Sequence, residues 1–550
     1  NSFCTLLVAM VRRVYSIGTT HVPETSPVNR YGSARHRSLE AVWSCALDAK
    51  RLWYSPSAQG RMDGPPGSSF GLYALKYAVR GTECEAMDQR IIHVASLDKC
   101  FERGVEIKRV TGCGPVRLML LSNGVLVTLS EDPAKHGVVI PHPAGRSSGA
   151  TITDAAAGEG HFVICDSEGA VYTWGWDNSF GQQGRGAIAP ADRDCIGVHE
   201  PRRLPGFGRG SKLSTSAADA NGVAPTVFEA RQAPNIVGVN CGRHHTVLLA
   251  ESGAAVYTFG RGHCGQLGLG RPDGRNGPAA LSRVELMPTP RCVPCTFGVP
   301  VREILCANDG HYTILALQSG GLVAWGENTT GAFGLGHSKS VPVPTPVMIP
   351  DLPATASEQA SNAADAASTP AAAPLQASAV KKSLPGPLEP RRIRKLVPAA
   401  KPGEPNPTGP PVVHAAASLT HTAVADVHGR LLTAGLRPIR VATEAMPVNA
   451  LGPLGRRPTS KQDAVTFGAV DGIFVDQDDR IACGDGYTAY LMRRQGLLFI
   501  VGSIAVDGKV LVGGGEEAHD LFNIATGVGR RVADIKATCN GGLLMVVDEE

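Results

Sequence analysis

The chain has 550 residues, of which 43% are hydrophobic and 19% charged, and its formal net charge is +4. This weak positive charge gives no support to nucleic-acid binding or to attachment at a membrane surface, and no apolar run reaches the roughly 18 residues that a bilayer span requires. The 65 glycines and 40 prolines are typical of a fold with many turns.

The first predicted element is a strand near the N-terminus, Val14-Tyr15-Ser16-Ile17-Gly18, which combines β-branched and aromatic residues. Residues 19–90 resemble no other part of the sequence and predict an irregular insertion region. If Met10 were the true start, residues 10–16 would resemble a short mitochondrial leader, although a strand at 14–18 argues against that role.

Three stretches of 26 residues repeat one phrase from a histidine to a glycine: His161–Gly186, His245–Gly270 and His311–Gly336. In the middle copy, Val247–Ala250 predicts a short strand, Ser252-Gly253 a turn and Val256–Gly260 the second strand of a hairpin. The glycine-rich residues Gly265–Gly270 predict a structured loop whose backbone conformation only glycine tolerates.

Weaker copies keep the strand–turn–strand pattern without the glycine loop. Together with the strong copies they give seven units, anchored at positions 113, 157, 241, 306, 417, 483 and 539. One unit cannot bury its apolar faces alone, so neighbouring units must pack together. The last copy stops at Asp548-Glu549-Glu550, before its second hairpin strand, and the N-terminal strand would supply it. The sequence therefore predicts an all-β, seven-bladed β-propeller over residues 10–550, closed by the N-terminal strand, with long disordered or irregular loop insertions.

The first of these insertions is the irregular region 19–90, which falls within the first blade. Residues 187–234 are expected to form a loop insertion, and the Ala- and Pro-rich residues 351–411 a disordered one, because they offer little surface to bury. Basic clusters at 381–382 and 391–395 are spaced like a two-part nuclear import signal. Residues 392–397 alternate instead like the strand that opens the next blade, and both interpretations stay open.

Residues that recur at one repeat position are interpreted as structural. They are the histidines His161, His245, His311 and His421, the aromatic residues Trp174, Phe259 and Trp325, the strand-end glycines Gly175, Gly260 and Gly326, and the loop glycines Gly181, Gly265 and Gly331. A repeated imidazole is expected to hydrogen-bond backbone within its own blade, and a repeated aromatic ring to pack the blade. Cys292 and Cys295 lack the second ligand pair of a structural zinc site. We therefore expect no catalytic residue, no cofactor and no metal.

The copies at 157–186, 241–270 and 306–336 resemble the repeats of the regulator of chromosome condensation family, whose repeats build seven-bladed propellers. The resemblance covers most of the chain outside the insertions, and the other four copies are diverged. It implies guanine-nucleotide exchange on a small GTPase, the activity of the best-known members. The chromatin-bound member acts on the nuclear GTPase Ran and also contacts histones. No contact residue of that member can be matched to this chain, because several of the loops are unrecognisable.

The leading hypothesis is a non-catalytic protein-interaction scaffold, since loops on a rigid frame carry binding functions. The alternative is a guanine-nucleotide exchange factor or regulator of a small GTPase, acting without covalent chemistry. A second alternative is an organellar or ribosome-associated propeller that touches RNA through the basic residues 381–401. The leading hypothesis expects a monomer with a protein partner, without nucleic acid or membrane. Fourteen cysteines spread along the chain favour a reducing, intracellular compartment, the cytoplasm or the nucleus.

Overall fold

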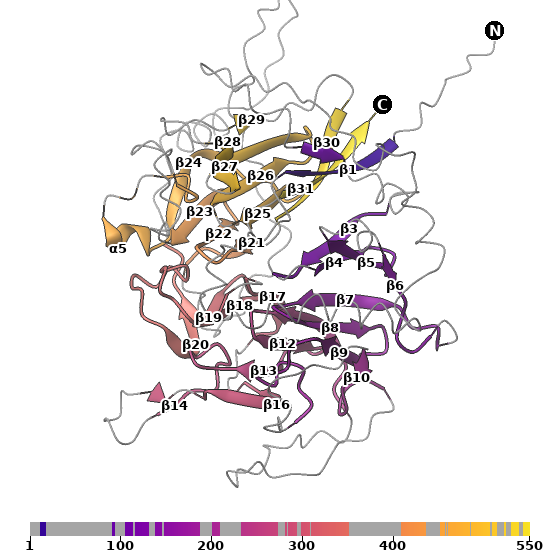
Figure 1. The fold of residues 1–550 in the computed structure, drawn as a ribbon. Coiled ribbons are helices and arrows are strands. Elements are labelled where there is room, and N and C mark those ends of the chain that lie inside the picture. Colours follow the sequence, from indigo (N-terminus) through magenta and orange to yellow (C-terminus); the bar gives the residue numbers. More distant parts are fainter. Residues whose placement is uncertain are drawn as a thin grey trace, which may run out of the picture.

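The computed structural model of the chain describes residues 11–17 and 91–93 and, with short gaps, residues 105–186, 201–209, 233–272, 281–350, 409–435 and 452–549. These parts consist almost entirely of antiparallel strands, together with a single-turn helix, α5 (Lys461–Ala464). The predicted all-β propeller class is confirmed, and the sheets follow one another around the molecule in chain order (Figure 1).

The described strands form seven sheets of four or five strands each. We number these sheets in chain order, starting with the sheet that contains β3. The first sheet contains β3 (Ile107–Thr111), β4 (Val116–Leu121), β5 (Leu126–Ser130) and β6 (Val139–Ile140). The second contains β7 (Ile152–Ala157), β8 (His161–Asp166), β9 (Val171–Gly175) and β10 (Arg202–Arg203). The third contains β11 (Ile236–Cys241), β12 (His245–Ala250), β13 (Val256–Arg261) and β16 (Leu286–Cys292), and β14 (Arg271–Pro272) pairs separately with β15 (Leu281–Ser282).

The remaining four sheets complete the chain. The fourth contains β17 (Val301–Leu305), β18 (Tyr312–Leu317), β19 (Leu322–Gly326) and β20 (Val341–Val347). The fifth contains β21 (Val412–Ala417), β22 (His421–Asp426), β23 (Arg430–Gly435) and β24 (Gly468–Phe474). The sixth contains β25 (Arg480–Gly484), β26 (Tyr487–Met492), β27 (Leu497–Val506), β28 (Lys509–Gly513) and β29 (Phe522–Asn523). The seventh combines β30 (Arg530–Ala537) and β31 (Leu543–Glu549) with β1 (Val11–Ile17) and β2 (Ile91–His93).

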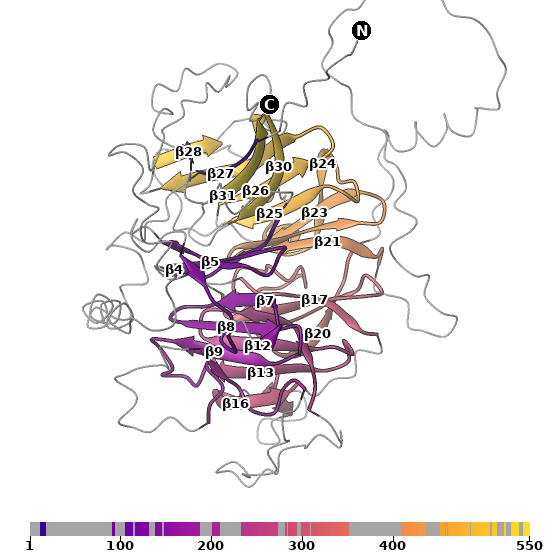
Figure 2. The same cartoon turned by 90° about the vertical axis from the view of Figure 1, so that its right-hand side faces the viewer.

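The innermost strand of each sheet contacts the innermost strand of the next. In order these strands are β3, β7, β11, β17, β21, β25 and β30, and β30 contacts β3 again. Figure 2 shows the sheets one above another in a view turned by 90°. The inner strands thus form a closed ring, which we call the inner rim.

The first and the last described strands meet in the seventh sheet. β1 pairs antiparallel with β31 from Val11 opposite Glu549 to Ile17 opposite Leu543, so the predicted closing strand forms (Figure 1). The stretch that resembles a leader sequence is part of this strand. The side chains of β1 and β2 lie outside the described residues, and the count of seven complete blades stays a prediction.

The predicted insertions fall mostly outside the described residues. This holds for all of 19–90, for 187–200 and 210–232, and for 351–408. Within the second insertion, β10 forms the outer strand of the second sheet. The stretch 392–397, considered as a strand that opens a blade, also lies outside, and the strand that opens the fifth sheet is β21.

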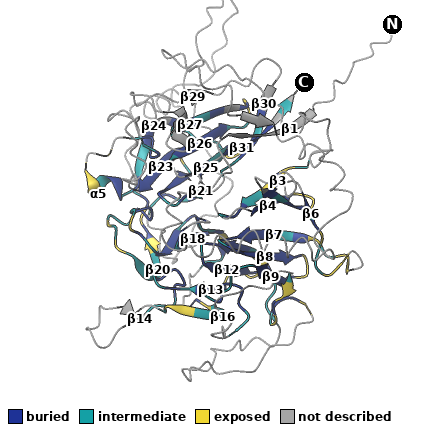
Figure 3. Cartoon of the chain, viewed as in Figure 1, coloured by how far each residue is buried: buried dark blue, intermediate teal, exposed yellow. Residues whose placement is uncertain are grey.

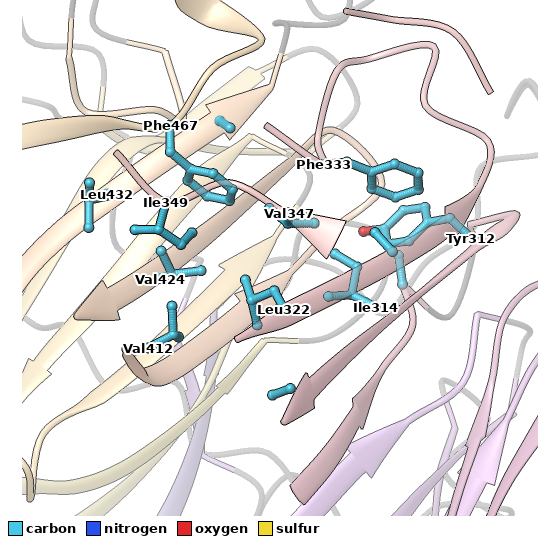
Figure 4. Packing of buried hydrophobic residues seen from close by; sticks show 14 residues of the cluster. Tyr312, Ile314, Leu322, Phe333, Val347, Ile349, Val412, Val424, Leu432 and Phe467 are labelled. Carbon is cyan, nitrogen blue, oxygen red and sulfur yellow. The ribbon is translucent and has the colours of Figure 1, made fainter. Parts of the chain in front are cut away.

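The core lies between adjacent sheets rather than in the middle of the molecule. Figure 4 shows the cluster between the fourth and fifth sheets, where Tyr312, Ile314 and Leu322 pack with Val412 and Val424. A similar cluster packs Ile107 and Met119 of the first sheet against Leu544 of the seventh, which closes the ring. Exposed residues gather at outer strands such as β10 and β16 (Figure 3). Each sheet is therefore buried on the faces that meet its neighbours.

Candidate interaction face

The glycine loops of the strong repeats share one face of the propeller. Because neighbouring strands are antiparallel, the loop that enters the second strand of a sheet and the loop that leaves its third strand lie at the same end. In the second, third and fourth sheets these are the residues just before His161, His245 and Tyr312, and the segments 176–186, 262–270 and 327–336. We call this end the glycine-loop face.

Each glycine loop packs against the next sheet. The loop glycines Gly181, Gly265 and Gly331 have φ of +68°, +85° and +70°, the left-handed conformation that glycine tolerates. A Cβ on Gly265 would lie 2.6 Å from Cα of Pro342 in β20, which no side chain fits. Gly181 lies in the same way against Pro288 of β16, and Gly331 lies against Val465, which follows α5 in the connection between β23 and β24. The loops are therefore fixed in place by the neighbouring sheet.

The repeated histidines link sheets. His161 Nε2 lies 3.1 Å from the Thr246 hydroxyl of the third sheet, and that hydroxyl donates to the Gln182 carbonyl at 2.8 Å. Because the hydroxyl hydrogen is used, the imidazole Nε2–H must be the donor to Thr246. The expectation of a backbone bond within the same blade was wrong for this nitrogen. A threonine follows the histidine position in most copies, and this supplies the partner.

Two more copies make the same link. His245 Nε2 lies 3.1 Å from the Thr313 hydroxyl, and His421 Nε2 lies 2.8 Å from the Thr488 hydroxyl. Burial lowers the pKa of His161 to about 4 and those of His245 and His421 to about 3. These imidazoles are neutral at physiological pH. The Thr488 hydroxyl donates to the Pro453 carbonyl at 2.8 Å, so Nε2–H of His421 is the donor in its bond, and both bonds link neighbouring sheets.

His311 does not occupy the histidine position. In the second and third sheets His161 lies opposite Gly175 and His245 opposite Gly260, whereas in the fourth sheet Tyr312 lies opposite Gly326. The hairpin turn of the third sheet is one residue longer than those of its neighbours, which shifts the apparent alignment. Tyr312 takes over the link, since its hydroxyl donates to the Ser418 carbonyl of the fifth sheet.

The repeated aromatic residues are packed between sheets. Trp174 stacks on Phe162 with ring centroids 5.3 Å apart, and Phe259 and Trp325 are fully buried. The Trp325 indole also donates to the Gln266 carbonyl at 2.9 Å. These positions hold the frame of the glycine-loop face together and do not form its contact surface.

That surface carries a row of rings, of which only His311 was predicted as a repeat position. Phe180, His244, His311 and His263 follow one another with ring centroids 5.0, 5.8 and 4.9 Å apart. The Arg261 guanidinium lies 4.4 Å from the Phe180 ring. We call these five residues the ring row. Phe180, His263 and Arg261 lie where the three strong copies differ from one another, whereas His244 and His311 each stand just before the linking residue of their sheet.

Charges beside the ring row are paired. Arg243 Nε donates to the Glu159 carboxylate at 2.6 Å, and His244 Nε2 lies 3.4 Å from the same carboxylate. Burial and then the neighbouring His263 lower the pKa of His311 to about 2, and burial lowers that of His244 well below its ordinary value. The imidazoles of His244 and His311 are therefore neutral at physiological pH, and the Arg243 guanidinium lies beside the row. Such half-buried aromatic and arginine groups are typical of protein contact sites.

Neither a metal site nor a membrane span emerges from the described parts of the chain. Over those residues no group of three or more His, Cys, Asp and Glu side chains is placed to hold a metal ion. Cys295 falls outside them, so the Cys292–Cys295 pair is not seen as a whole. None of the described helices is long and apolar enough to cross a membrane.

Comparisons with known proteins point to one repeat family. The model of the family described as "Regulator of chromosome condensation (RCC1) repeat" matches residues 152–182. The chain is 30% identical over 234 residues to human "Probable E3 ubiquitin-protein ligase HERC3", covering 38% of this chain and 21% of that protein. It is 25% identical over 313 residues to "Protein RCC2 homolog" of Xenopus laevis, covering 55% and 52%. The chain thus spans only a part of these relatives.

Among solved structures, the chain is similar to Prp20p from Saccharomyces cerevisiae, which was studied together with its binding to Gsp1p and histones. The TM-score is 0.50 at 15% identity, and the match covers 84% of this chain and 86% of that one. At this identity the likeness shows the fold alone.

Proposed function

Because the chain is a diverged member of the regulator of chromosome condensation repeat family, we propose that it is a non-catalytic scaffold that binds a protein partner through its glycine-loop face. The ring row carries this proposal. Its side chains stand on loops that the next sheet fixes in place, so little conformational entropy is lost on binding. The buried, free Cys165 and Cys241 suit a reducing compartment inside the cell.

The test starts with the endogenous protein, tagged, crosslinked mildly and purified with its partners. The partner is then titrated against the purified full chain and two variants. Phe180→Ala with Arg261→Ala removes the cation–π pair, and we expect at least a tenfold loss of affinity. Gln318→Ala, at the hairpin end of the fourth sheet, serves as the control. Equal affinity for all three proteins would place the contact elsewhere.

A second candidate is guanine-nucleotide exchange on a small GTPase. The family resemblance and the Gsp1p binding of Prp20p, whose fold this chain shares, support it. The three intact glycine loops lie on one face, as an exchange surface would require. The direct assay measures the release of a fluorescent guanine nucleotide from a panel of small GTPases. Unchanged release across the panel would exclude exchange activity and leave the scaffold as the remaining proposal. The ligase activity in the name of HERC3 is not proposed, since the chain spans 21% of that protein.

A further inference from the structure

The inner rim is lined by charged side chains that the interaction face does not use. The described ones are the cations Lys108, Arg109, Arg302, Arg480 and Lys536 and the carboxylates Asp154, Glu303 and Asp534. Among the side chains of these strands that the structure describes, five cations against three carboxylates leave an excess of two positive charges. The rim therefore favours an anion.

Two of these cations stand at irregular points of the inner strands. The registers of β3 and β17 shift between Ile107 and Arg109 and between Val301 and Glu303, so Lys108 and Arg302 are the extra residues of two bulges. Both are exposed. Each reaches the next inner strand: the Lys108 ammonium donates to the Thr153 carbonyl, and Arg302 Nη1 donates to the Val412 carbonyl at 3.3 Å.

Arg302 and a third cation, Arg480, both act on His414 of the fifth sheet. His414 lies two residues after Val412, and its Nε2 is 3.1 Å from the Gln477 carbonyl oxygen. Gln477 in turn lies three residues before Arg480 in the chain. Burial lowers the pKa of His414, and the positive charges of Arg480 and Arg302 lower it further, while the backbone at 476–477 acts in the opposite direction. The imidazole therefore lies in a positive potential made by two guanidinium groups from neighbouring sheets.

Two of the three carboxylates are already paired. Asp154 Oδ2 lies 3.3 Å from Arg109 Nη1 and accepts the Val239 N–H at 3.0 Å. Asp534 lies 3.4 Å from Lys536 Nζ and 3.9 Å from Arg480 Nε. Glu303, which follows Arg302 in β17, is the remaining described carboxylate of these strands, so the five cations are not matched one for one.

Charges on sheets that are not neighbours in the ring influence one another. Burial lowers the pKa of Arg109, but the carboxylates of Asp154 and of Glu303 outweigh it and raise the pKa overall. Arg109 belongs to the first sheet and Glu303 to the fourth, which are not neighbours in the ring. Charges thus act on one another across the rim, which suits a compact ligand rather than a folded partner.

We propose that the inner rim binds a compact polyanion bearing phosphate groups, held by Lys108, Arg302 and Arg480. Guanidinium groups match phosphate oxygens with paired hydrogen bonds, and the ammonium group adds a point charge. This site is separate from the glycine-loop face, so the proposal does not depend on the proposed protein partner. Binding places negative charge beside His414, so it raises the pKa of that imidazole.

Isothermal titration of the full chain with inorganic tripolyphosphate at low and at physiological salt tests the proposal. We expect one saturable site that weakens as salt rises, a Kd at least tenfold higher for Arg302→Ala and for Lys108→Ala, and an upward shift of the His414 imidazole titration in NMR. Arg209→Ala is the matched control, since that side chain is 73% exposed on the outer part of the second sheet. Melting temperatures check that each variant folds.

The basic residues 391–395 are the competing site, and charge-neutral variants there must keep full binding. Loss of binding in those variants, absence of saturable heat, or equal affinity of Arg302→Ala, Lys108→Ala and wild type would overturn the proposal. An unchanged His414 titration in the presence of saturating tripolyphosphate would do the same.

Discussion

Arg493 donates through Nη2 to the carboxylate of Glu106 at 2.6 Å, although 387 residues separate them in the chain. The same guanidinium donates through Nε to the Ala533 carbonyl at 3.2 Å. One side chain of the sixth sheet thus contacts both the seventh and the first. It links these three sheets at the place where the last sheet of the ring meets the first, which we call the seam.

Arg493→Ala should lower the free energy of unfolding by about 1–2 kcal/mol, because it removes a partly exposed ion pair and a hydrogen bond to backbone. Urea denaturation measures this difference. Arg494→Ala is the matched control, since Arg494 is 56% exposed and pairs with Asp478 in the same region. If both variants lost the same stability, Arg493 would have no special role at the seam.

Deleting residues 1–17 should destabilise the whole ring, since β31 then loses its paired neighbour along seven positions. The expected result is a lower melting temperature and a broader transition in calorimetry. An unchanged melting temperature would contradict the closure of the ring by β1.

Thr313→Val should cost about 1–3 kcal/mol, because Nε2 of the buried His245 loses its hydrogen bond to the Thr313 hydroxyl. A double-mutant cycle with His245→Ala isolates the interaction, and the coupling should account for most of the loss. Thr329→Val is the control, because its hydroxyl bonds to Glu327 on the exposed surface. Additive losses in the cycle would rule out the inter-sheet bond.

Stability should fall as the pH drops below about 6.5. Burial places the folded pKa of His161 at about 4, below the ordinary value, so the unfolded chain binds more protons between these limits. The contribution of each such buried neutral histidine to the free energy of unfolding is complete above pH ~6.5. It is lost as the pH falls toward 4, at up to about 1.4 kcal/mol per pH unit. Urea denaturation at several pH values measures the slope. His161→Gln should flatten it, and an identical slope would refute the assignment.

Gly265→Ala should destabilise by more than Gly186→Ala. Both glycines have positive φ, +85° and +101°, which costs an L-residue roughly 1–2 kcal/mol. Only at Gly265 would the new Cβ also meet Pro342, whereas nothing lies within 4 Å of one at Gly186. Comparing the two melting temperatures separates the clash from the strain, and equal losses would show that the loop does not press on β20.

The repeat pattern predicted the strands, the hairpins and the closing strand because these depend on short-range alternation and glycine spacing. It could not predict the partner of His161, since Thr246 belongs to another repeat 85 residues away. It also placed His311 at the histidine position, because a one-residue difference in hairpin length hides the shift to Tyr312. Phe180 and Arg261 were missed because they do not recur.

The histidine of each linking bond is encoded in one repeat and its acceptor in the next. A repeat therefore carries halves of two different bonds, and its residues are matched to both of its neighbours. Tyr312 forms a different link, since its hydroxyl donates to the Ser418 carbonyl although the neighbouring sheet keeps a threonine, Thr422, at the usual position. Copying, deleting or exchanging a single repeat would separate matched halves. We therefore expect that substitutions which preserve these bonds affect two adjacent repeats together, although the repeats share the same strand pattern.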